Sequence, residues 1–304
     1  MTIISIILPI FLLIIGGFVL RKTNVMKEEW VHMLNSFVYY IALPALIIVS
    51  FWDVRWAAPG LLRLVGMNCL FLIGFAVLLG VFLALLPMNR RLKASVFLAA
   101  LVSNSIYMGF PLGKLSFGPE GADITVAVGT LFLAFGIILS IIGIEIFWKP
   151  ESYRGYVREF AKNPLIIGVV LGALTIFFGG VPGPLVVVHT TLAMVAAIAS
   201  PAALLALGGF LAGRFTREVV WFAALASSVK LLAFPALIFV ADVLVGGGIR
   251  EVGTSMLLAA MPVAVTTFVI AERFNLDQSL VASSIVMSTM ASVVTIPLVL
   301  ALWV

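Results

Sequence analysis

A few neutral polar side chains in the middle of apolar stretches are the residues of this sequence that could bind a ligand. Asn104 lies between two serines in one such stretch, and Pro262 lies in another, followed by Val263 and Thr266. Amide and hydroxyl groups bind small polar ligands through hydrogen bonds, and a proline within a helix frees a backbone carbonyl in the preceding turn. The sequence therefore predicts ligand contacts at Ser103, Asn104, Ser105, Pro262, Val263, Thr266 and Lys230.

Lys230 is the one charged residue in the middle of an apolar stretch. A charge at the centre of a membrane helix costs about 2.5 to 3.5 kcal/mol on insertion scales, so such a residue usually has a role. The amine could hold an anionic ligand, it could exchange a proton, or it could neutralise backbone carbonyls as a structural counter-charge. The sequence leaves these three roles open.

The composition excludes a soluble globular protein. Of the 304 residues, 63% are hydrophobic and only 10% are charged, whereas soluble domains carry about 25% charged residues. The single cysteine, Cys69, excludes an internal disulfide and a thiolate metal cluster. The His-Glu-x-x-His and Gly-x-Ser-x-Gly motifs of membrane-embedded enzymes do not occur. We therefore expect a non-enzymatic membrane protein without a cofactor, a metal or a nucleic-acid partner.

Ten stretches are long and apolar enough to cross a bilayer. A helix needs about 20 predominantly apolar residues to span a hydrocarbon core about 30 Å thick, and the turn at residues 179–184 divides one long stretch into two. No basic residue precedes the first stretch, so we expect an uncleaved helix rather than a signal peptide. The predicted spans are Met1–Leu20, Val31–Trp52, Leu64–Asn89, Ala94–Gly113, Ile124–Ile144, two within Asn163–Gly213, Val219–Ala241, Val252–Ala271 and Gln278–Val304.

Basic residues are distributed unevenly between the loops. Thirteen fall in alternate loops that would face the cytoplasm, and four fall in the other loops. Because loops rich in lysine and arginine stay in the cytoplasm, both termini are predicted to lie outside, in the periplasm of a bacterial inner membrane. The thirteen are Arg21, Lys22, Lys27, Arg90, Arg91, Lys93, Lys149, Arg154, Arg158, Lys162, Arg214, Arg217 and Arg273, and the four are Arg55, Arg63, Lys114 and Arg250.

The ten predicted spans divide into two repeats of five, residues 1–150 and 151–304. Pro44 in the second span and Pro201 in the seventh are 157 residues apart, and Asn104 in the fourth and Pro262 in the ninth are 158 residues apart. Because each repeat has an odd number of helices, the second must be inverted relative to the first. Inverted repeats are typical of secondary transporters, although a channel lined by broken helices would share most of these features.

The fourth and ninth spans are predicted to be broken at corresponding places. The polar residues Ser103–Ser105, then Gly109 and Pro111, would interrupt the fourth span, and Pro262 would interrupt the ninth. Pro44 and Pro201 are candidate hinge positions. Broken backbone is tolerated at membrane depth only where it is buried in protein or lines a wet cavity. Each break exposes a half-helix N-terminus, whose free N–H groups and positive dipole end favour an anion. The alternative is that Pro111 and Pro262 are ordinary kinks in packed helices.

Seven short motifs occur in order along nearly the whole chain. They are Leu34–Pro44, Ser103–Ser105, Met108–Leu112, Asn163–Ile166, Ala260–Pro262, Ser288–Thr289 and Thr295–Pro297. Together they resemble the auxin efflux carrier family, which includes malonate and malate carriers and is similar to the plant auxin exporters. The resemblance implies the architecture of bile-acid symporters and sodium/proton antiporters, with the fourth and ninth spans crossing. The first, second, sixth and seventh spans would form a scaffold, the others an elevator-type transport domain, and Asn104 would contact substrate.

The expected function is secondary transport of small organic anions, which are carboxylates such as malonate or malate, or auxin-like acids. The chain has no long loop between the fifth and sixth spans and no acidic residue in the third span, so a small bacterial metabolite is favoured over auxin. Ser103 stands where the plant exporters have proline, which leaves the geometry of the break in the fourth span open. The alternative is a cation/proton antiporter or a channel of the same fold. We also expect a homodimer in the lipid bilayer.

The position of the acidic residues favours proton coupling or simple facilitation over coupling to sodium. Neither crossing span contains a carboxylate, which a sodium site would normally require. Asp242 falls near the outer end of the eighth span and is predicted to be exposed at the interface. His189, at the start of the seventh span, is expected to be interfacial or packed rather than a proton relay.

Overall fold

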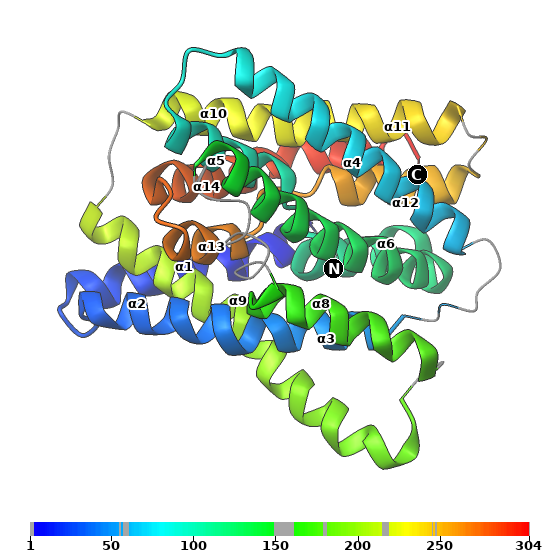
Figure 1. Cartoon of the computed structure of the whole chain (residues 1–304), viewed down its shortest axis with the longest axis horizontal. Helices are drawn as coiled ribbons and strands as arrows, with labels where there is room; N and C mark the ends of the chain where they lie inside the picture. The colour runs from blue at the N-terminus through cyan, green and yellow to red at the C-terminus, as the bar shows by residue number, and fades with distance from the viewer. Residues whose placement is uncertain are drawn as a thin grey trace.

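The chain folds into helices joined by short connections (Figure 1). The computed structural model describes residues 3–54, 56, 61–148, 161–178, 181–214, 219–244, 246 and 248–303, and within these ranges there is no β-strand beyond an isolated bridge. The prediction of an all-α fold is confirmed. Five residues used to predict the orientation, Arg55, Lys149, Arg154, Arg158 and Arg217, lie outside the described residues.

The helices fall in the predicted apolar stretches. The first half of the chain contains α1 (Ile3–Lys22), α2 (Glu28–Phe37), η1 (Val38–Ala42), α3 (Leu43–Trp52), α4 (Leu61–Leu85), α5 (Arg90–Leu101), η2 (Ser105–Gly109) and α6 (Phe110–Phe147). The second half contains α8 (Pro164–Thr175), η3 (Ile176–Phe178), η4 (Gly183–Leu185), α9 (Val186–Arg214), α10 (Val220–Ser228), η6 (Val229–Ala233), α11 (Phe234–Leu244), α12 (Ile249–Ala259), α13 (Thr266–Arg273) and α14 (Gln278–Leu300).

Six helices within the described residues are long and apolar enough to cross a membrane. They are Glu28–Trp52, Leu61–Leu85, Gly121–Phe147, Gly183–Ala212, Val220–Leu244 and Gln278–Leu300. The chain is therefore a multi-pass membrane protein. Of the other predicted spans, the sixth is the shorter apolar helix Pro164–Phe178, and the fourth and ninth are interrupted by non-helical residues.

The connection between the fourth and fifth predicted spans is a tight turn. The range of α6 (Phe110–Phe147) contains two helices that meet at Gly118, whose φ of 70° and ψ of −161° are not helical. Glycine adopts this conformation, which is strained for other residues. The chain reverses there, because Gly113 lies against the Thr125 side chain, whereas residues twelve positions apart in one continuous helix are separated by about 18 Å.

Three wide turns of π-helix precede prolines inside these spans. The turns η1, η2 and η6 are each followed, two residues after their end, by Pro44, Pro111 and Pro235. Proline lacks the N–H of the helical ladder and its ring crowds the carbonyl one turn earlier, and a π turn relieves both effects. The helices therefore bend at these prolines without ending there, and Pro201 likewise lies inside the continuous helix α9.

The helices pack as two groups. The first helix group contains α1, α2, α3, α8 and α9, with α9 packed along α1, α2 and α3. The second helix group contains α4, α5, α6, α10, α11, α12 and α14, in which α6 packs on α4, α5 and α12, and α14 packs on α10. In Figure 1, α2, α3 and α9 lie in the lower part and the second group lies above them. The short helix α13 contacts both groups.

Within the first helix group, α1 and α9 approach so closely that only glycine fits. A Cβ atom added to Gly17 would lie 2.1 Å from the carbonyl oxygen of Leu205, and one added to Gly208 would lie 2.0 Å from that of Ile14. Small residues at helix crossings let backbones pack tightly where no hydrophobic effect drives association. These glycines therefore hold the first group together.

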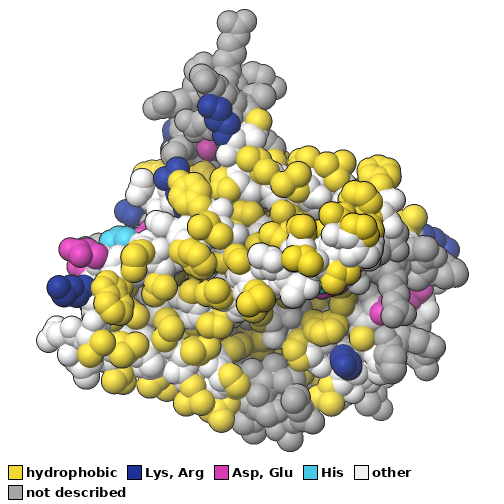
Figure 2. Space-filling view, turned by 90° about the horizontal axis from the view of Figure 1, so that it is seen from below, with side chains coloured by type: hydrophobic (Ala, Val, Ile, Leu, Met, Phe, Trp, Pro, Cys, Tyr) yellow, Lys and Arg dark blue, Asp and Glu magenta, His cyan; other side chains and the backbone are white. Residues whose placement is uncertain are grey.

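The outer surface is apolar, as lipid contact requires. Figure 2 shows hydrophobic side chains over most of one face, with the charged side chains mainly toward its edges. The exposed apolar residues include Leu70, Val77 and Leu78 on α4 and Val187 and Met194 on α9. Large contiguous areas of exposed apolar side chains are rare on soluble monomers, so this surface fits a bilayer.

Candidate binding site where two broken helices cross

The two interrupted spans meet at their breaks. Residues 102–104 separate α5 from η2, and residues 260–265 separate α12 from α13. The two segments run antiparallel through a bridge between Ser103 and Val263. The Asn104 N–H donates to the Pro262 carbonyl at 2.9 Å, and the Ala264 N–H donates to the Val102 carbonyl at 3.0 Å. Residues that are 158 positions apart in the sequence are therefore in direct contact.

The backbone at both breaks is not helical, and groups outside each helix take up its hydrogen bonds. Val102 is extended, with φ −92° and ψ 113°, and Asn104 has φ −76° and ψ 51°. Pro262 cannot donate to a helical ladder. The N–H of Val263 donates instead to the Ser288 hydroxyl of α14 at 3.0 Å. Two short segments are thus held by each other and by α14 rather than by helical hydrogen bonds.

Three hydroxyls at this crossing have no hydrogen-bond partner. They are those of Ser103, Ser105 and Thr266, whose residues are at most 2% exposed. Asn104 is also buried, and no side-chain hydrogen bond joins it to the described residues. Buried polar groups in native proteins are normally paired with protein, water or ligand. The crossing therefore presents polar groups that a small ligand could satisfy, and all of them were predicted from the sequence.

The charges of the helix ends at the crossing favour an anion. The helical residues that follow each break begin at Ser105 and Thr266. Helix N-termini carry free N–H groups and a partial positive charge. Because neither Ala94–Gly113 nor Val252–Ala271 contains an acidic residue, these segments offer no carboxylate of their own to the two N-termini. A carboxylate ligand would complement them.

Lys230 contacts the end of α12, directly before the crossing. The side chain is completely buried in η6, and its Nζ donates to the carbonyl of Ala259, the last residue of α12. Nζ also lies 4.7 Å from the centre of the Phe234 ring. A cation at a helix C-terminus is favourable because the carbonyls there carry partial negative charge. This geometry fits the counter-charge role among the three that the sequence left open.

A cavity of about 1030 Å³ opens beside α13, and the sequence did not predict it. It is lined by Asn35 and Tyr40 near α2, by Val269 and Glu272 of α13, and by residues 275–279. Eight residues of α13 connect the crossing to this cavity, a length of about 12 Å at 1.5 Å per residue. The cavity therefore lies one short helix away from the crossing, at the end of the molecule that carries Arg91 and Arg273.

One carboxylate in this cavity bridges helices that are far apart in the chain. Glu272 of α13 pairs with Nδ1 of His32 and accepts a hydrogen bond from the Asn35 amide, both on α2. The neighbouring Arg273 guanidinium lies 5.4 Å from the centre of the Tyr40 ring. Because Glu272 and His32 are 240 residues apart, neither periodicity nor composition could indicate this contact.

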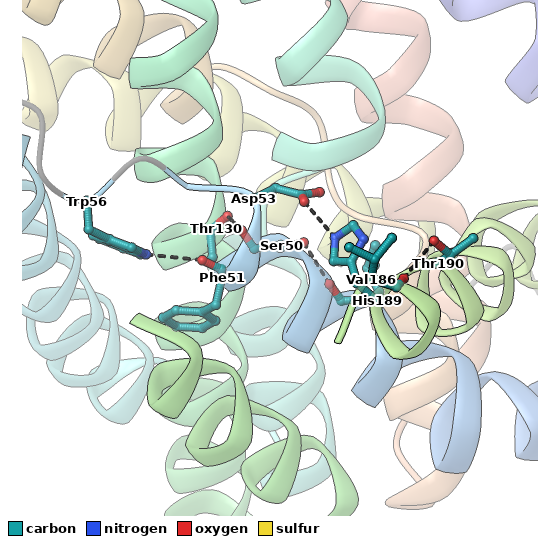
Figure 3. A network of polar contacts seen from close by, with 9 residues as sticks. Ser50, Phe51, Asp53, Trp56, Thr130, Val186, His189 and Thr190 are labelled. Atoms are coloured by element: carbon teal, nitrogen blue, oxygen red, sulfur yellow. Dashed lines mark hydrogen bonds and ion pairs between the residues drawn. The ribbon is translucent and has the colours of Figure 1, made fainter. Parts of the chain in front are cut away.

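A second polar network lies near the end of α3 and the start of α9 (Figure 3). His189 Nε2 pairs with Asp53 Oδ1 at 2.8 Å, and the Thr130 hydroxyl donates to the Ser50 carbonyl at 3.2 Å. His189 also packs edge-on against Trp52. It is therefore a paired and partly packed histidine, and Thr130 connects α6 of the second helix group to α3 of the first.

The prediction that Asp242 is exposed is wrong. Asp242 is only 3% exposed, because α11 turns this face toward α4 and α12. Its carboxylate lies beside Ser255 of α12. A residue near a helix end was expected to reach the interface, but tertiary packing covers it.

Comparison with known proteins agrees with this architecture. A family model described as "Membrane transport protein" matches residues 2–300. The chain is 30% identical to the "Putative malonate transporter" of Rhizobium meliloti, over 96% of this chain and 93% of that protein.

Two further relatives are uncharacterized transporters. One, from Methanocaldococcus jannaschii, is 25% identical over 98% of this chain and 97% of its own length. The other, from Escherichia coli, is 25% identical over 96% of this chain and 94% of its own length. The family description and the names of these relatives all refer to transport. The chain therefore belongs to the membrane transport protein family, which is the auxin efflux carrier family that its motifs resemble.

Proposed function

We propose that the protein is a secondary transporter of small organic anions and binds a carboxylate at the crossing of its broken helices. The observation that carries the proposal is the group of three unpaired hydroxyls, on Ser103, Ser105 and Thr266, beside two helix N-termini. Asn104 supplies an amide to the same place, and Pro262 and Val263 form the opposite wall. Hydrogen bonds from neutral groups and helix dipoles bind a carboxylate without an arginine.

A small dicarboxylate is the substrate class that we favour. The name of the Rhizobium meliloti relative refers to malonate, and a compact anion suits a site formed by two short backbone segments. Lys230 supports this site indirectly, since its amine is bound to the Ala259 carbonyl. In this proposal it keeps the carboxyl end of α12 in place and offsets part of the negative dipole there.

The transport movement that we propose is of the elevator type. The first helix group would be the scaffold and the second, with α13, the moving domain that carries the crossing. Ten membrane crossings in two inverted repeats, residues 1–150 and 151–304, would place both termini outside the inner membrane. The division of the helices into two packing groups supports this proposal, and two such protomers would form a homodimer through their scaffolds.

Uptake into proteoliposomes tests the proposal. Purified protein should take up one or more members of a panel of radiolabelled dicarboxylates, monocarboxylates and indole acids, with saturation and with counterflow against unlabelled anion. Counterflow separates a carrier from a channel, because a channel does not exchange substrate against a gradient. If no anion in the panel is moved or raises the melting temperature, the anion-carrier proposal is wrong.

A further inference from the structure

A buried polar cluster joins three helices of the second group away from the crossing. It contains Asp242 of α11, Ser255 of α12 and Asn68 of α4, each at most 3% exposed. The Asn68 amide nitrogen donates to the Ser255 hydroxyl at 3.0 Å and to the Leu64 carbonyl at 3.0 Å. The Asp242 carboxylate lies beside Ser255. The cluster is therefore a group of adjoining buried polar side chains that includes one carboxylate.

Two oxygens of this cluster have no hydrogen-bond partner. They are Asp242 Oδ2 and the Asn68 amide oxygen Oδ1, and both are buried acceptors. The two N–H groups of the Asn68 amide are already used, so among these three side chains only the one hydroxyl proton of Ser255 is left to donate. The cluster therefore has more buried acceptors than donors.

The charged groups around Asp242 do not neutralise it. Glu251 of α12 faces it and is itself acidic. Lys230, earlier on the same continuous helix, directs its amine to the Ala259 carbonyl. On α4 the ionisable residues are Arg63, at the exposed start, and the buried Cys69. No ion pair joins Asp242 to a basic side chain within the described part of the chain, which leaves out the side chain of Arg250.

A carboxylate that is buried without a counter-charge is unfavourable, and it is stabilised by taking up a proton or a metal cation. A metal cation requires several oxygen ligands, whereas the cluster has two unpaired oxygens. One proton on Asp242 converts an unpaired acceptor into a hydroxyl donor. The geometry therefore favours a proton.

We propose that Asp242, with Ser255 and Asn68, is the proton-carrying site that couples anion transport to the proton gradient. This inference rests on the proposed function. The cluster and the crossing are connected, because Ser255 lies four residues before Ala259, about 6 Å along α12, and the break follows directly. Both sites therefore lie on the same helix group, and a proton carried there would offset part of the negative charge that the anion brings into the membrane.

The variant that tests this inference is Asp242→Asn, which keeps the size of the side chain and cannot release a proton. In proteoliposomes at equal pH on both sides we expect it to retain malonate counterflow, and with an imposed pH gradient we expect it to lose the stimulation of uptake. The matched control is Asp53→Asn, which changes a half-exposed carboxylate in the other polar network and should retain the stimulation.

A second measurement does not depend on transport. Infrared spectra of the purified wild-type protein should show a protonated carboxyl band that disappears on alkaline titration, and Asp242→Asn should lack this band. The inference is overturned if uptake by the wild-type protein requires sodium or ignores the pH gradient, or if Asp242→Asn keeps full stimulation. If the wild-type protein moves no anion in the panel, the proposed function is at fault, and the carboxyl band alone then decides whether Asp242 holds a proton.

Discussion

Three side chains at the crossing bear an energetic cost that a ligand would remove. A buried hydroxyl without a hydrogen bond costs about 1 to 3 kcal/mol, and Ser103, Ser105 and Thr266 are all in this state. Because a bound carboxylate offers several acceptor positions, it can accept from these hydroxyls. Removal of such a hydroxyl should therefore maintain or raise the stability of the ligand-free protein and lower its affinity for the ligand.

Replacement of Thr266 by valine tests this trade-off. Thr266→Val keeps the shape of the side chain and removes an unpaired hydroxyl, so the melting temperature of the ligand-free protein should stay the same or rise. Affinity for malonate should fall about five-fold, which corresponds to one hydrogen bond worth about 1 kcal/mol. The control Thr125→Val removes a hydroxyl that is bonded to the Gly121 carbonyl, so it should lower stability and leave the affinity unchanged. The opposite pattern would show that Thr266 has only a packing role.

Lys230 should prove structural rather than substrate-binding. Lys230→Met keeps much of the apolar stem but leaves the Ala259 carbonyl without its amine. We expect the melting temperature to fall by several degrees, because a buried acceptor loses its partner, at a cost of about 1 to 3 kcal/mol. The affinity for malonate, measured by calorimetry, should change less than three-fold. A loss of affinity in a variant of normal stability would instead place the amine on the substrate.

At the scale of elements, the sequence predicted which helices break. Pro262 marks the break in the ninth span, because a proline and the residues around it cannot complete the helical ladder there. In the fourth span the interruption was expected over Ser103–Ser105, Gly109 and Pro111 without a fixed geometry, and the non-helical residues are 102–104. Those residues leave the helix to pair with the other segment, and this pairing has no local signal. Pro111 is accommodated by the π turn before it.

The same reasoning separates the residues that could be predicted from those that could not. Asn104 and Thr266 stood out because polar residues are conspicuous within apolar stretches. Asp242 and the Glu272 cluster depend on contacts between distant parts of the chain. Charged residues near helix ends are usually exposed, so the sequence gives no reason to expect them in a buried cluster or a cavity.

The close crossing of α1 and α9 gives a prediction at this scale. A methyl group at Gly17 would lie 2.1 Å from the Leu205 carbonyl oxygen, so Gly17→Ala must push the two helices apart. Overpacking of this kind costs about 1 to 3 kcal/mol, and thermal unfolding in detergent should show a lower melting temperature. Gly74→Ala on α4 is the matched control, because an added methyl group meets no atom within 4 Å. Equal melting temperatures for the two variants would contradict the packing argument.

At the scale of the whole molecule, the two helix groups touch through a small number of polar contacts near opposite ends. Glu272 of α13 contacts His32 and Asn35 of α2 at one end, and Thr130 of α6 contacts Ser50 of α3 at the other. If the second group moves as an elevator, contacts of this kind must separate during each cycle. Contacts within the first group, such as His189 with Asp53, should persist.

Cross-linking tests whether the groups move. A double variant with cysteines in place of His32 and Glu272, joined by a short bis-maleimide, should lose malonate transport, whereas each single variant should keep it. The matched control replaces His189 and Asp53 by cysteine within the first group, and its cross-link should leave transport intact. The one native cysteine, Cys69, is buried, so it should not interfere. Full transport by the cross-linked His32 and Glu272 pair would exclude an elevator movement between these helices.

The measurement that tests the account most directly is the affinity of purified protein for malonate and related carboxylates in Asn104→Ala, determined by isothermal titration calorimetry. The control is Asn24→Gly, which changes an exposed asparagine at a positive φ of 59° that glycine adopts freely. The account predicts that the wild-type protein and the control bind at least one of these anions equally well, and that Asn104→Ala binds it at least ten-fold more weakly with its fold intact. Wild-type affinity in a folded Asn104→Ala variant would contradict an anion site at the crossing.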